Sequence, residues 1–219
     1  MGIWEINAGQ LLIAGGPVMV PIILCSVIAF GIVLSKLIYF GSLQTDTHKL
    51  KNRVFDLLKE NRIDEAIAVC QANKSPVAKI LKAGILKSGE SKETIKEAME
   101  DISLFEIPKL EKRFTALSTI AHVTPLLGLL GTVTGMTGSF HTIQARASTM
   151  NPVTPADLAG GIWEALLTTV AGLIVAIPTF VAYNYLLSRV NAFVLEMERA
   201  ATELLNFLHN MNEEKQALE

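Results

Sequence analysis

Charged residues are scarce in this sequence, in which Asp, Glu, Lys and Arg make up 18% of the residues and apolar types 50%. The mean hydropathy is +0.40, which indicates that much of the chain dissolves in lipid. The formal net charge is −2, and the basic residues form blocks along the chain rather than one patch that could follow a phosphate backbone. The composition therefore predicts a membrane protein and argues against a nucleic-acid binder.

Cysteine and histidine are too few and too scattered to build a disulfide framework or a metal site. Cys25 lies in an apolar run, Cys70 lies in a Lys/Glu-rich region, and none of the four histidines has a second ligand at helical spacing. The sequence also lacks a phosphate-binding loop, a nucleophile elbow and a pair of catalytic carboxylates. We therefore expect no disulfide, no metal, no cofactor and no enzymatic activity.

Three long uncharged segments dominate what the sequence does contain. No Asp, Glu, Lys or Arg occurs in residues 6–35, 115–145 or 165–188. A helix needs about 20 apolar residues to cross a hydrocarbon core of about 30 Å, so each segment is long enough to span a bilayer. A cleaved signal peptide is the alternative for the first segment, but residues 1–17 hold no Lys or Arg. We predict an all-α integral membrane protein with three transmembrane helices and long cytoplasmic helical extensions.

The distribution of Lys and Arg predicts the orientation of these helices. Residues 42–114 contain fourteen of them and residues 188–219 contain three, whereas residues 144–158 contain one and residues 1–17 contain none. Lys and Arg accumulate in the cytoplasmic connections of membrane proteins. The N-terminus and the 144–158 loop are therefore expected outside, and the other two regions inside.

The predicted cytoplasmic region has the spacing of helices and no convincing strand. Leu50 and Val54 begin an apolar helical face. Ser91 predicts the N-cap of a helix that we expect to continue through Pro108 into the second span. After the third span, an apolar stripe carries a helix on into the cytoplasm. Lys36 lies at the cytoplasmic end of the first span, where its stem can snorkel to the interface.

The sequence thus predicts seven parts in order. They are a periplasmic N-terminus (1–10), a first transmembrane helix (11–40), a cytoplasmic helical region (41–114), a second transmembrane helix (115–143), a short periplasmic loop (144–160), a third transmembrane helix (161–187) and a cytoplasmic C-terminal helix (188–219).

A stripe of small and hydroxyl residues follows one face of the second span. It consists of Gly128, Thr132, Gly135, Ser139 and Thr142. Spacings of three and four place these residues on one helical face. Small residues at this spacing allow transmembrane helices to pack closely, and we expect Gly172 of the third span to serve the same purpose. The alternative is that the hydroxyls line a polar path.

Glu164 is the only acidic residue beside or inside a predicted span. A carboxylate at a helix centre costs about 2.5–3.5 kcal/mol on insertion scales, so such residues usually have a function. Thr168 lies one turn further on the same face and Thr169 on an adjoining face, which allows a polar track into the membrane. The alternative is that Glu164 lies in water at the outer interface and has no function.

Two histidines of the second span, His122 and His141, could titrate near neutral pH and relay protons. Each falls near a predicted membrane boundary, where an imidazole is simply hydrated. We favour the second interpretation for both.

The two inner spans contain the segments AHVTPLLGLLGTVTGMTGSF at 121–140 and LAGGIWEALLTTVAGLIVAIPTFVAYNYL at 158–186. Both segments resemble the ExbB/TolQ/MotA proton-channel family. Residues 16–40 resemble the first helix of the ExbB/TolQ branch, most closely ExbB, and the three-span layout fits that branch better than four-span MotA-type proteins. One departure is Ser35 followed by Lys36, where many relatives have an acidic and a basic residue.

This resemblance implies a homopentamer in the bacterial inner membrane, surrounding the transmembrane helices of an ExbD- or TolR-like partner. Such complexes convert proton-motive force into mechanical work on the cell envelope, in biopolymer or siderophore uptake, envelope maintenance or motility. The family's pore threonines fall on Thr132 and Thr169 and its pore glutamate on Glu164, with Thr168 as an extra hydroxyl.

The charge pattern agrees with a carrier group on another chain. No Asp or Glu lies in the middle of any span, yet use of the membrane potential requires a titratable group at that depth. We therefore expect another chain to supply a carboxylate, and the family resemblance implies that it is a transmembrane Asp of the single-span partner. A Na⁺-driven motor subunit and a membrane scaffold without ion conduction remain the alternatives, and a self-sufficient channel would need the carboxylate that is missing.

Overall fold

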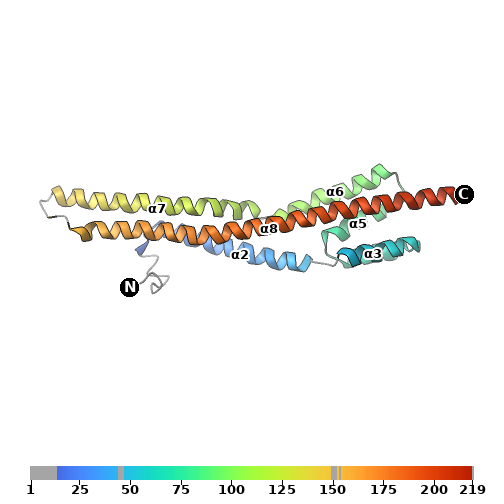
Figure 1. Cartoon of the computed structure of the whole chain (residues 1–219), viewed down its shortest axis with the longest axis horizontal. Helices are drawn as coiled ribbons and strands as arrows, with labels where there is room; N and C mark the ends of the chain where they lie inside the picture. The colour runs from blue at the N-terminus through green and yellow to red at the C-terminus, as the bar shows by residue number, and fades with distance from the viewer. Residues whose placement is uncertain (1–13, 44–46, 149–151, 153, 219) are drawn as a thin grey trace. The chain divides into compact units, whose positions relative to one another are not determined.

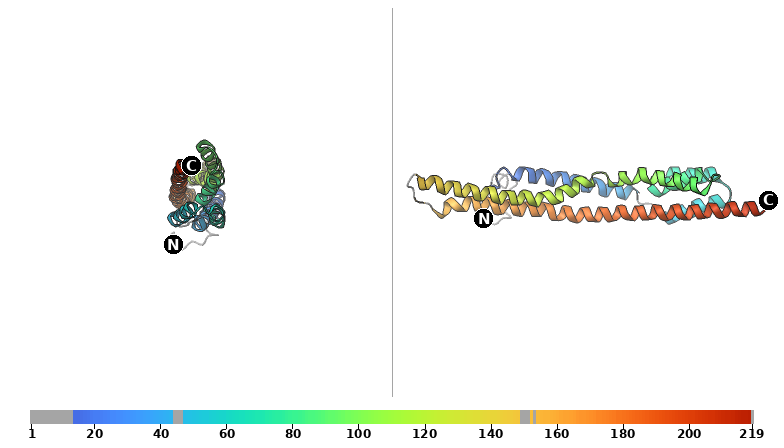
Figure 2. Two further views of the ribbon diagram at one scale, coloured as in Figure 1. Left: turned by 90° about the vertical axis from the view of Figure 1, so that its right-hand side faces the viewer. Right: turned by 90° about the horizontal axis from the view of Figure 1, so that it is seen from above.

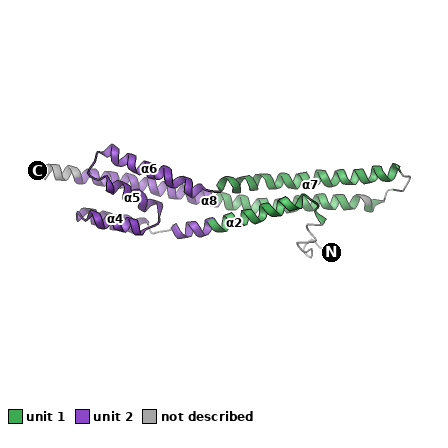
Figure 3. Ribbon diagram, turned by 180° about the vertical axis from the view of Figure 1, so that it is seen from behind, with its two compact units in different colours: residues 1–35, 113–184 green, residues 36–112, 185–219 purple. Residues whose placement is uncertain are grey.

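The computed structural model describes residues 14–43, 47–148, 152 and 154–218, and its described elements are all helices (Figure 1). The helices are α2 (Met19–Leu43), α3 (Thr47–Lys59), α4 (Ile63–Ala72), α5 (Pro76–Leu86), α6 (Lys92–Glu111), α7 (Phe114–Ser148) and α8 (Pro155–Leu218). They form two compact units (Figure 3). The first comprises residues up to Ser35 with Arg113–Asn184, and the second comprises Lys36–Lys112 with the chain from Tyr185 onward.

The first unit contains the apolar parts of α2, α7 and α8. Three helices of the described chain are long and apolar enough to cross a membrane, which confirms the predicted all-α architecture with three spans. In this unit α7 and α8 run side by side (Figures 1 and 2). Large apolar side chains point outward on every span, for example Phe30 (71% exposed), Leu126 (61%) and Val181 (62%). An aqueous surface would make such exposure costly, whereas lipid or a neighbouring helix would not.

Helix α2 begins at Met19, whereas the first transmembrane helix was predicted over 11–40. Residues 11–13 lie outside the described part of the chain, and within that part α2 begins at Met19. Gly16 has a φ of 65°, a left-handed conformation that ends regular helix geometry. Pro17 follows it, and the backbone N–H of Met19 donates to the Gly16 carbonyl at 3.1 Å. The predicted start ignored this Gly-Pro turn.

The helices that contain the two inner spans are longer than the predicted spans. The second span was expected over 115–143 with a loop over 144–160, but α7 continues to Ser148 and α8 begins at Pro155. Proline suits the first turn of a helix because its missing N–H has no intrahelical partner there.

The predicted continuous helix from Ser91 into the second span is wrong. The chain breaks between α6 and α7, where Lys112 has a ψ of 130° and Arg113 a φ of 73°. A left-handed residue with a Cβ cannot continue a right-handed helix. The prediction of Ser91 as an N-cap is confirmed, since its hydroxyl accepts a hydrogen bond from the backbone N–H of Thr94 at 3.3 Å.

The second unit is a bundle in which α3 to α6 pack against one face of the later part of α8. Its core contains the predicted face that begins with Leu50 and Val54, together with Met197 and Leu204 of α8. Cys70 also lies in this core as a free thiol. Burial raises the pKa of the Cys70 thiol to about 11, against a smaller lowering by Lys82, so this cysteine is a packing residue at neutral pH.

Candidate ion-pathway site

The contact between α7 and α8 is built from residues with little or no side chain. A methyl group added at Gly128 would lie 3.1 Å from the Cα atom of Thr169. One added at Gly172 would lie 2.9 Å from the backbone oxygen of Thr124. These distances are shorter than van der Waals contact, so the two helices touch backbone to backbone at this level.

The same contact continues toward the connection between the two helices. A methyl group added at Gly135 would lie 2.6 Å from the backbone oxygen of Gly161. Ser139 is buried and donates a hydrogen bond to the backbone oxygen of Leu158 at 3.3 Å. As the residue number rises along α7, the number of the α8 residue in contact falls, so the two helices are antiparallel.

Two members of the predicted stripe, Thr132 and Thr142, are not buried in the helix contact. Gly131 is buried in the contact, whereas Thr132 is only half-buried and Thr142 is exposed. The space that a Gly131 side chain would fill is occupied by the hydroxyl and Cβ atoms of Thr168. Residues three apart and residues four apart both share a helical face. Gly131, three positions after Gly128, could therefore have been predicted as a member of the helix contact.

Thr168 lies inside the helix contact rather than on an open face. Its exposed fraction is 0%. The hydroxyl donates to the backbone oxygens of Ala165 at 2.9 Å and Glu164 at 3.2 Å, both on its own helix. A hydroxyl held in this way has no direct access to water or to another chain, so the geometry favours packing for Thr168 over the predicted place in an ion path.

Thr169 and Thr132 are half-buried hydroxyl residues of this helix pair. The Thr169 hydroxyl is within hydrogen-bond distance of the Gly128 backbone oxygen on α7, at 3.2 Å, and of the Ala165 oxygen, at 3.3 Å. The Thr132 hydroxyl donates to the Leu129 oxygen at 2.6 Å. Each hydroxyl oxygen keeps lone pairs that can accept a hydrogen bond from another group.

Glu164 points to a different side of α8 from Thr169. Its carboxylate lies against Gly16, in the turn before α2. The two residues are five positions apart, which corresponds to directions about 140° apart on a helix of 3.6 residues per turn. The predicted track from Glu164 through Thr168 to Thr169 is therefore divided among three directions: the α2 side, the α7 contact and a third, half-open side.

A groove of about 360 Å³ lies between α2 and α8 on the same side as Glu164. Its lining includes Ser26 and Phe30 of α2 and Val175 and Pro178 of α8. Val175 is eleven positions after Glu164, so the two side chains point within about 20° of each other around the α8 axis. The lining contains no charged residue, so it offers an ion no counter-charge.

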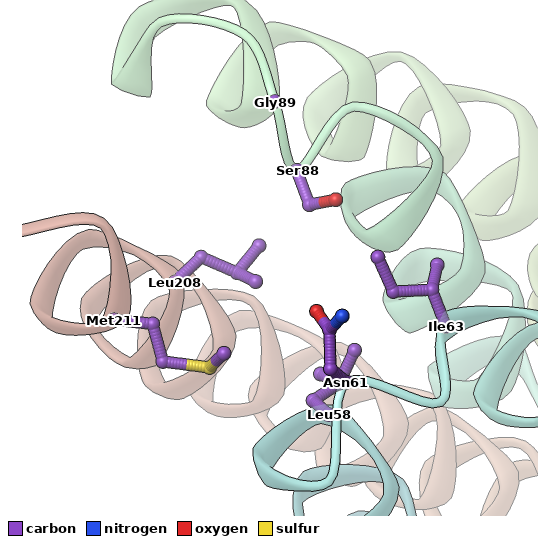
Figure 4. Close-up of a pocket in the computed structure, with 7 residues that line it drawn as sticks. All are labelled: Leu58, Asn61, Ile63, Ser88, Gly89, Leu208 and Met211. Atoms are coloured by element: carbon purple, nitrogen blue, oxygen red, sulfur yellow. The ribbon is translucent and has the colours of Figure 1, made fainter. Parts of the chain in front are cut away.

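A second hollow lies in the other unit, where the α3–α4 and α5–α6 turns meet α8 (Figure 4). Its volume is about 160 Å³. Its seven lining residues are Leu58, Asn61, Ile63, Ser88, Gly89, Leu208 and Met211. They carry no charge and belong to the helical bundle, so this hollow has none of the chemistry expected of an ion path. Within the described residues no group of three His, Cys, Asp or Glu side chains could hold a metal ion.

Lys36 was predicted to snorkel to the membrane interface, but the structure buries it. Only 6% of the residue is exposed. The Nζ atom donates to the backbone oxygens of Leu110 at 2.6 Å and Lys109 at 3.4 Å. The last carbonyls of a helix lack intrahelical partners and carry partial negative charge. An ammonium group at the end of α6 satisfies them, which explains the burial.

Glu106 is a second buried charge that the sequence did not predict. Its side chain is 5% exposed and accepts hydrogen bonds of 2.6 Å from both Lys79 of α5 and Lys109 of α6. Burial alone would raise the pKa of the Glu106 carboxyl, but the hydrogen bonds from Lys109 and Lys79 outweigh it and hold the pKa below its usual range. The spacing of three to Lys109 was a local signal, whereas Lys79 is brought in by the fold.

Comparison with known proteins identifies the family. The sequence matches the MotA/TolQ/ExbB proton channel family over residues 72–199, more than half of the chain. It is 31% identical over 206 residues to the ExbB-like 3 protein of Synechocystis sp., covering 93% of this chain and 97% of that protein.

Two further relatives come from the ExbB and TolQ groups. The biopolymer transport protein ExbB of Salmonella typhimurium is 30% identical over 202 residues, covering 86% of this chain and 79% of that protein. The Tol-Pal system protein TolQ of Haemophilus influenzae is 41% identical over 105 residues, covering 48% and 44%. With its three long apolar helices, this chain is a multi-pass membrane protein that belongs to the MotA/TolQ/ExbB proton channel family, in the ExbB/TolQ branch.

Proposed function

We propose that this chain is the channel-forming subunit of a proton-driven motor in the inner membrane, and that it has no enzymatic activity. Five copies would surround the transmembrane helices of an ExbD- or TolR-like partner and convert proton-motive force into mechanical work on the cell envelope. The N-terminus and the α7–α8 connection would face the periplasm, and the helical bundle with the C-terminus would face the cytoplasm, as the distribution of Lys and Arg favours.

One observation carries the proposal: the half-buried hydroxyls of Thr132 and Thr169 lie on a helix pair without a carboxylate at their level. Movement of one charge through 100 mV is worth about 2.3 kcal/mol, but only if a titratable group crosses that field. A partner Asp facing these hydroxyls would supply that group. Each threonine hydroxyl would rotate away from its backbone acceptor and donate to the charged form of that Asp, which lowers the cost of a carboxylate in the membrane.

Glu164 would act at the outer end of the pathway. A negative charge there raises the local concentration of protons and other cations. Its contact with Gly16 places it beside the turn before α2, one and a half helical turns from Thr169 toward the connection with α7. Gly128, Gly135, Ser139, Gly172 and Thr168 would hold the α7–α8 pair together.

The work that such a motor performs is proposed from its relatives. The ExbB relative is named a biopolymer transport protein and the TolQ relative a Tol-Pal system protein. We propose that this chain energises transport or envelope maintenance of the same general kind. A purified complex will also decide between H⁺ and Na⁺ as the driving ion.

The first test is native mass spectrometry of the protein gently extracted from its source membrane. The expected result is five copies together with a single-span protein that carries a transmembrane Asp. A monomer, or an assembly without such a partner under conditions that preserve a known motor complex, would support a scaffold instead.

The second test compares Thr169→Val with Thr179→Val in vesicles that contain the purified complex. Thr179 is a buried threonine of the same helix whose hydroxyl donates to its own backbone at Val175, 2.7 Å away. Proton flux should fall in the Thr169 variant and persist in the Thr179 variant. Equal flux in both, with assembly intact, would refute a role for Thr169 in the path.

A further inference from the structure

The imidazole of His122 is exposed on α7 and is held in one tautomer. Its Nδ1 atom lies 2.7 Å from the backbone oxygen of Ser118. A carbonyl oxygen can only accept a hydrogen bond, so Nδ1 carries the proton in the neutral ring. The Nε2 atom then has a lone pair, which can bind a second proton. The local backbone thus prepares this ring to accept a proton at one defined atom.

His122 opens to the same side of the helix pair as Thr169. Its ring packs edge-on against Phe180 of α8, with ring centroids 5.9 Å apart and an interplanar angle of 87°. Phe180 is eleven positions after Thr169, so the two point within about 20° of each other. Glu164 and the groove under α2 lie on a different side of α8.

His122 lies further from the helix ends than the boundary position favoured from the sequence, and this depth argues that its side of the helix pair is not covered by lipid. Arg113 is nine positions before His122 on α7, and Arg189 is nine positions after Phe180 on α8. At 1.5 Å per residue, the imidazole lies about 13 Å inward from the nearest cation on each helix. An unpaired imidazole nitrogen at that depth in hydrocarbon would be costly. Water or a polar partner therefore has to reach this face.

Few other titratable groups face the ring. Neither α7 between Arg113 and Arg146 nor α8 between Glu164 and Arg189 contains Lys, Arg, Asp or Glu. Tyr183 lies one turn from Phe180, but its ring packs against Phe114. Asn184 is polar and exposed on the same side, and its amide donates to the Phe180 backbone oxygen at 3.0 Å. The imidazole is therefore the group in this neighbourhood whose nitrogen lone pair can bind a proton.

We propose that His122 is a proton-binding residue at the cytoplasmic end of the ion path, an inference that rests on the proposed function of the chain. The Nε2 lone pair accepts the proton that leaves the partner's carboxylic acid, which becomes a carboxylate, and the ring becomes an imidazolium. The Nε2–H bond then breaks toward water on the cytoplasmic side, and the neutral ring returns. Atoms and charge balance without any further reactant.

The test measures proton flux in vesicles that contain the complex of this chain with its co-purified partner. His122→Asn keeps an N–H donor for the Ser118 oxygen, and His122→Gln is a second variant with no titratable group. We expect flux to fall about tenfold or more in both, because a positioned acid or base contributes at least that factor to proton transfer. The dependence of flux on cytoplasmic pH between 5 and 8 should flatten as well.

His141→Gln is the matched control, because His141 is the other exposed histidine of α7 and lies toward the opposite end of the helix. It should conduct like the unmodified chain. Free imidazole in the cytoplasmic-side buffer should restore flux in His122→Gly and leave Thr169→Val inactive. Unchanged flux and pH profile in both His122→Asn and His122→Gln would overturn the inference.

The outcomes separate this inference from the proposed function. Flux through the unmodified complex that depends on Thr169 but not on His122 overturns the role of His122 alone, whereas absence of flux in the unmodified complex overturns both. If neither His122 variant assembles, NMR of the complex with His48, His141 and His209 replaced by Gln decides. An imidazole that stays neutral from pH 8 to 5 contradicts the proposal, and one that binds a proton at Nε2 supports it.

Discussion

The ammonium of Lys36 donates a hydrogen bond of 2.6 Å to the backbone oxygen of Leu110, the last turn of α6. The two residues are 74 positions apart in the sequence. This bond connects the last third of α2 to the end of α6, directly before the break at Lys112 and Arg113. A buried lysine is stabilised here because its partners are carbonyl groups at the negative end of a helix.

Replacement of Lys36 should destabilise the chain. Lys36→Met keeps the apolar stem and leaves the carbonyls of Leu110 and Lys109 without this donor. Unsatisfied buried polar groups cost about 1–3 kcal/mol each, so the thermal unfolding midpoint of the protein in detergent should fall. Lys59→Met, at an exposed lysine in the last turn of α3, is the control. Equal midpoints for the two variants would contradict a capping role for Lys36.

Loss of the Glu106 charge should weaken the contact between α5 and α6. Glu106→Gln removes one partner of two ion pairs of 2.6 Å. Hydrogen bonds to charged groups contribute about 1.5–3 kcal/mol, and the half-exposed lysines reduce the effect, so we expect a loss of about 2 kcal/mol. Glu100→Gln, in the exposed pair with Lys96, should change the unfolding midpoint very little. A loss no larger than that of the control would contradict this account.

The same carboxyl predicts a dependence of stability on pH. Its pKa is lower in the folded chain than its ordinary value, so the unfolded chain binds the proton more tightly. The stabilisation is present above the ordinary Glu pKa of about 4.3 and is lost as the pH falls through and below that value. Unfolding midpoints measured from pH 7 to 3 should converge for the unmodified chain and Glu106→Gln. A constant difference over that interval would exclude the carboxylate as the cause.

Addition of one methyl group at Gly131 should disrupt the α7–α8 contact. In Gly131→Ala the new Cβ would lie 2.5 Å from the Cβ atom of Thr168, which is too close for either atom to remain in place. Overpacking of this kind costs about 1–3 kcal/mol. Gly138→Ala is the control, because nothing lies within 4 Å of its added Cβ and alanine favours a helix over glycine. A Gly131 variant as stable as this control would show that the helices can separate freely.

Adjacent threonines of α8 should differ in their effect on proton flux. Thr168→Val keeps the buried volume and loses only hydrogen bonds to its own helix. We expect assembly to persist and flux to stay within about twofold of the unmodified complex. Thr169→Val should reduce flux strongly. Proton flux should be measured for both variants in parallel. A larger loss of flux in Thr168→Val than in Thr169→Val would assign the ion path to Thr168 instead.

Much of the architecture follows from local properties of the sequence. The number of spans could be predicted from the long segments without charged residues. The helices of the second unit could be predicted from apolar residues at helical spacing, such as Leu50 and Val54, which lie in its core. Ser91 was recognised because an N-cap involves only the first turn of its own helix. The break at Arg113 was missed because no glycine marks its left-handed backbone. The nearby hydrogen bond from Lys36 to the Leu110 oxygen joins residues that are far apart in the sequence, so no local pattern indicated it either.

The sequence by itself determined that this chain crosses a membrane three times and that its inner helices carry the small and hydroxyl residues of a proton-channel family. Only the tertiary structure decided which neighbour faces which surface: Gly131 rather than Thr132 enters the contact, Thr168 rather than Thr169 is enclosed, and Glu164 lies over Gly16. One position along a helix turns a side chain by about 100°, so spacings of three and four leave that choice open. The rotation of each helix is set by the segments packed against it, which lie far away in the sequence.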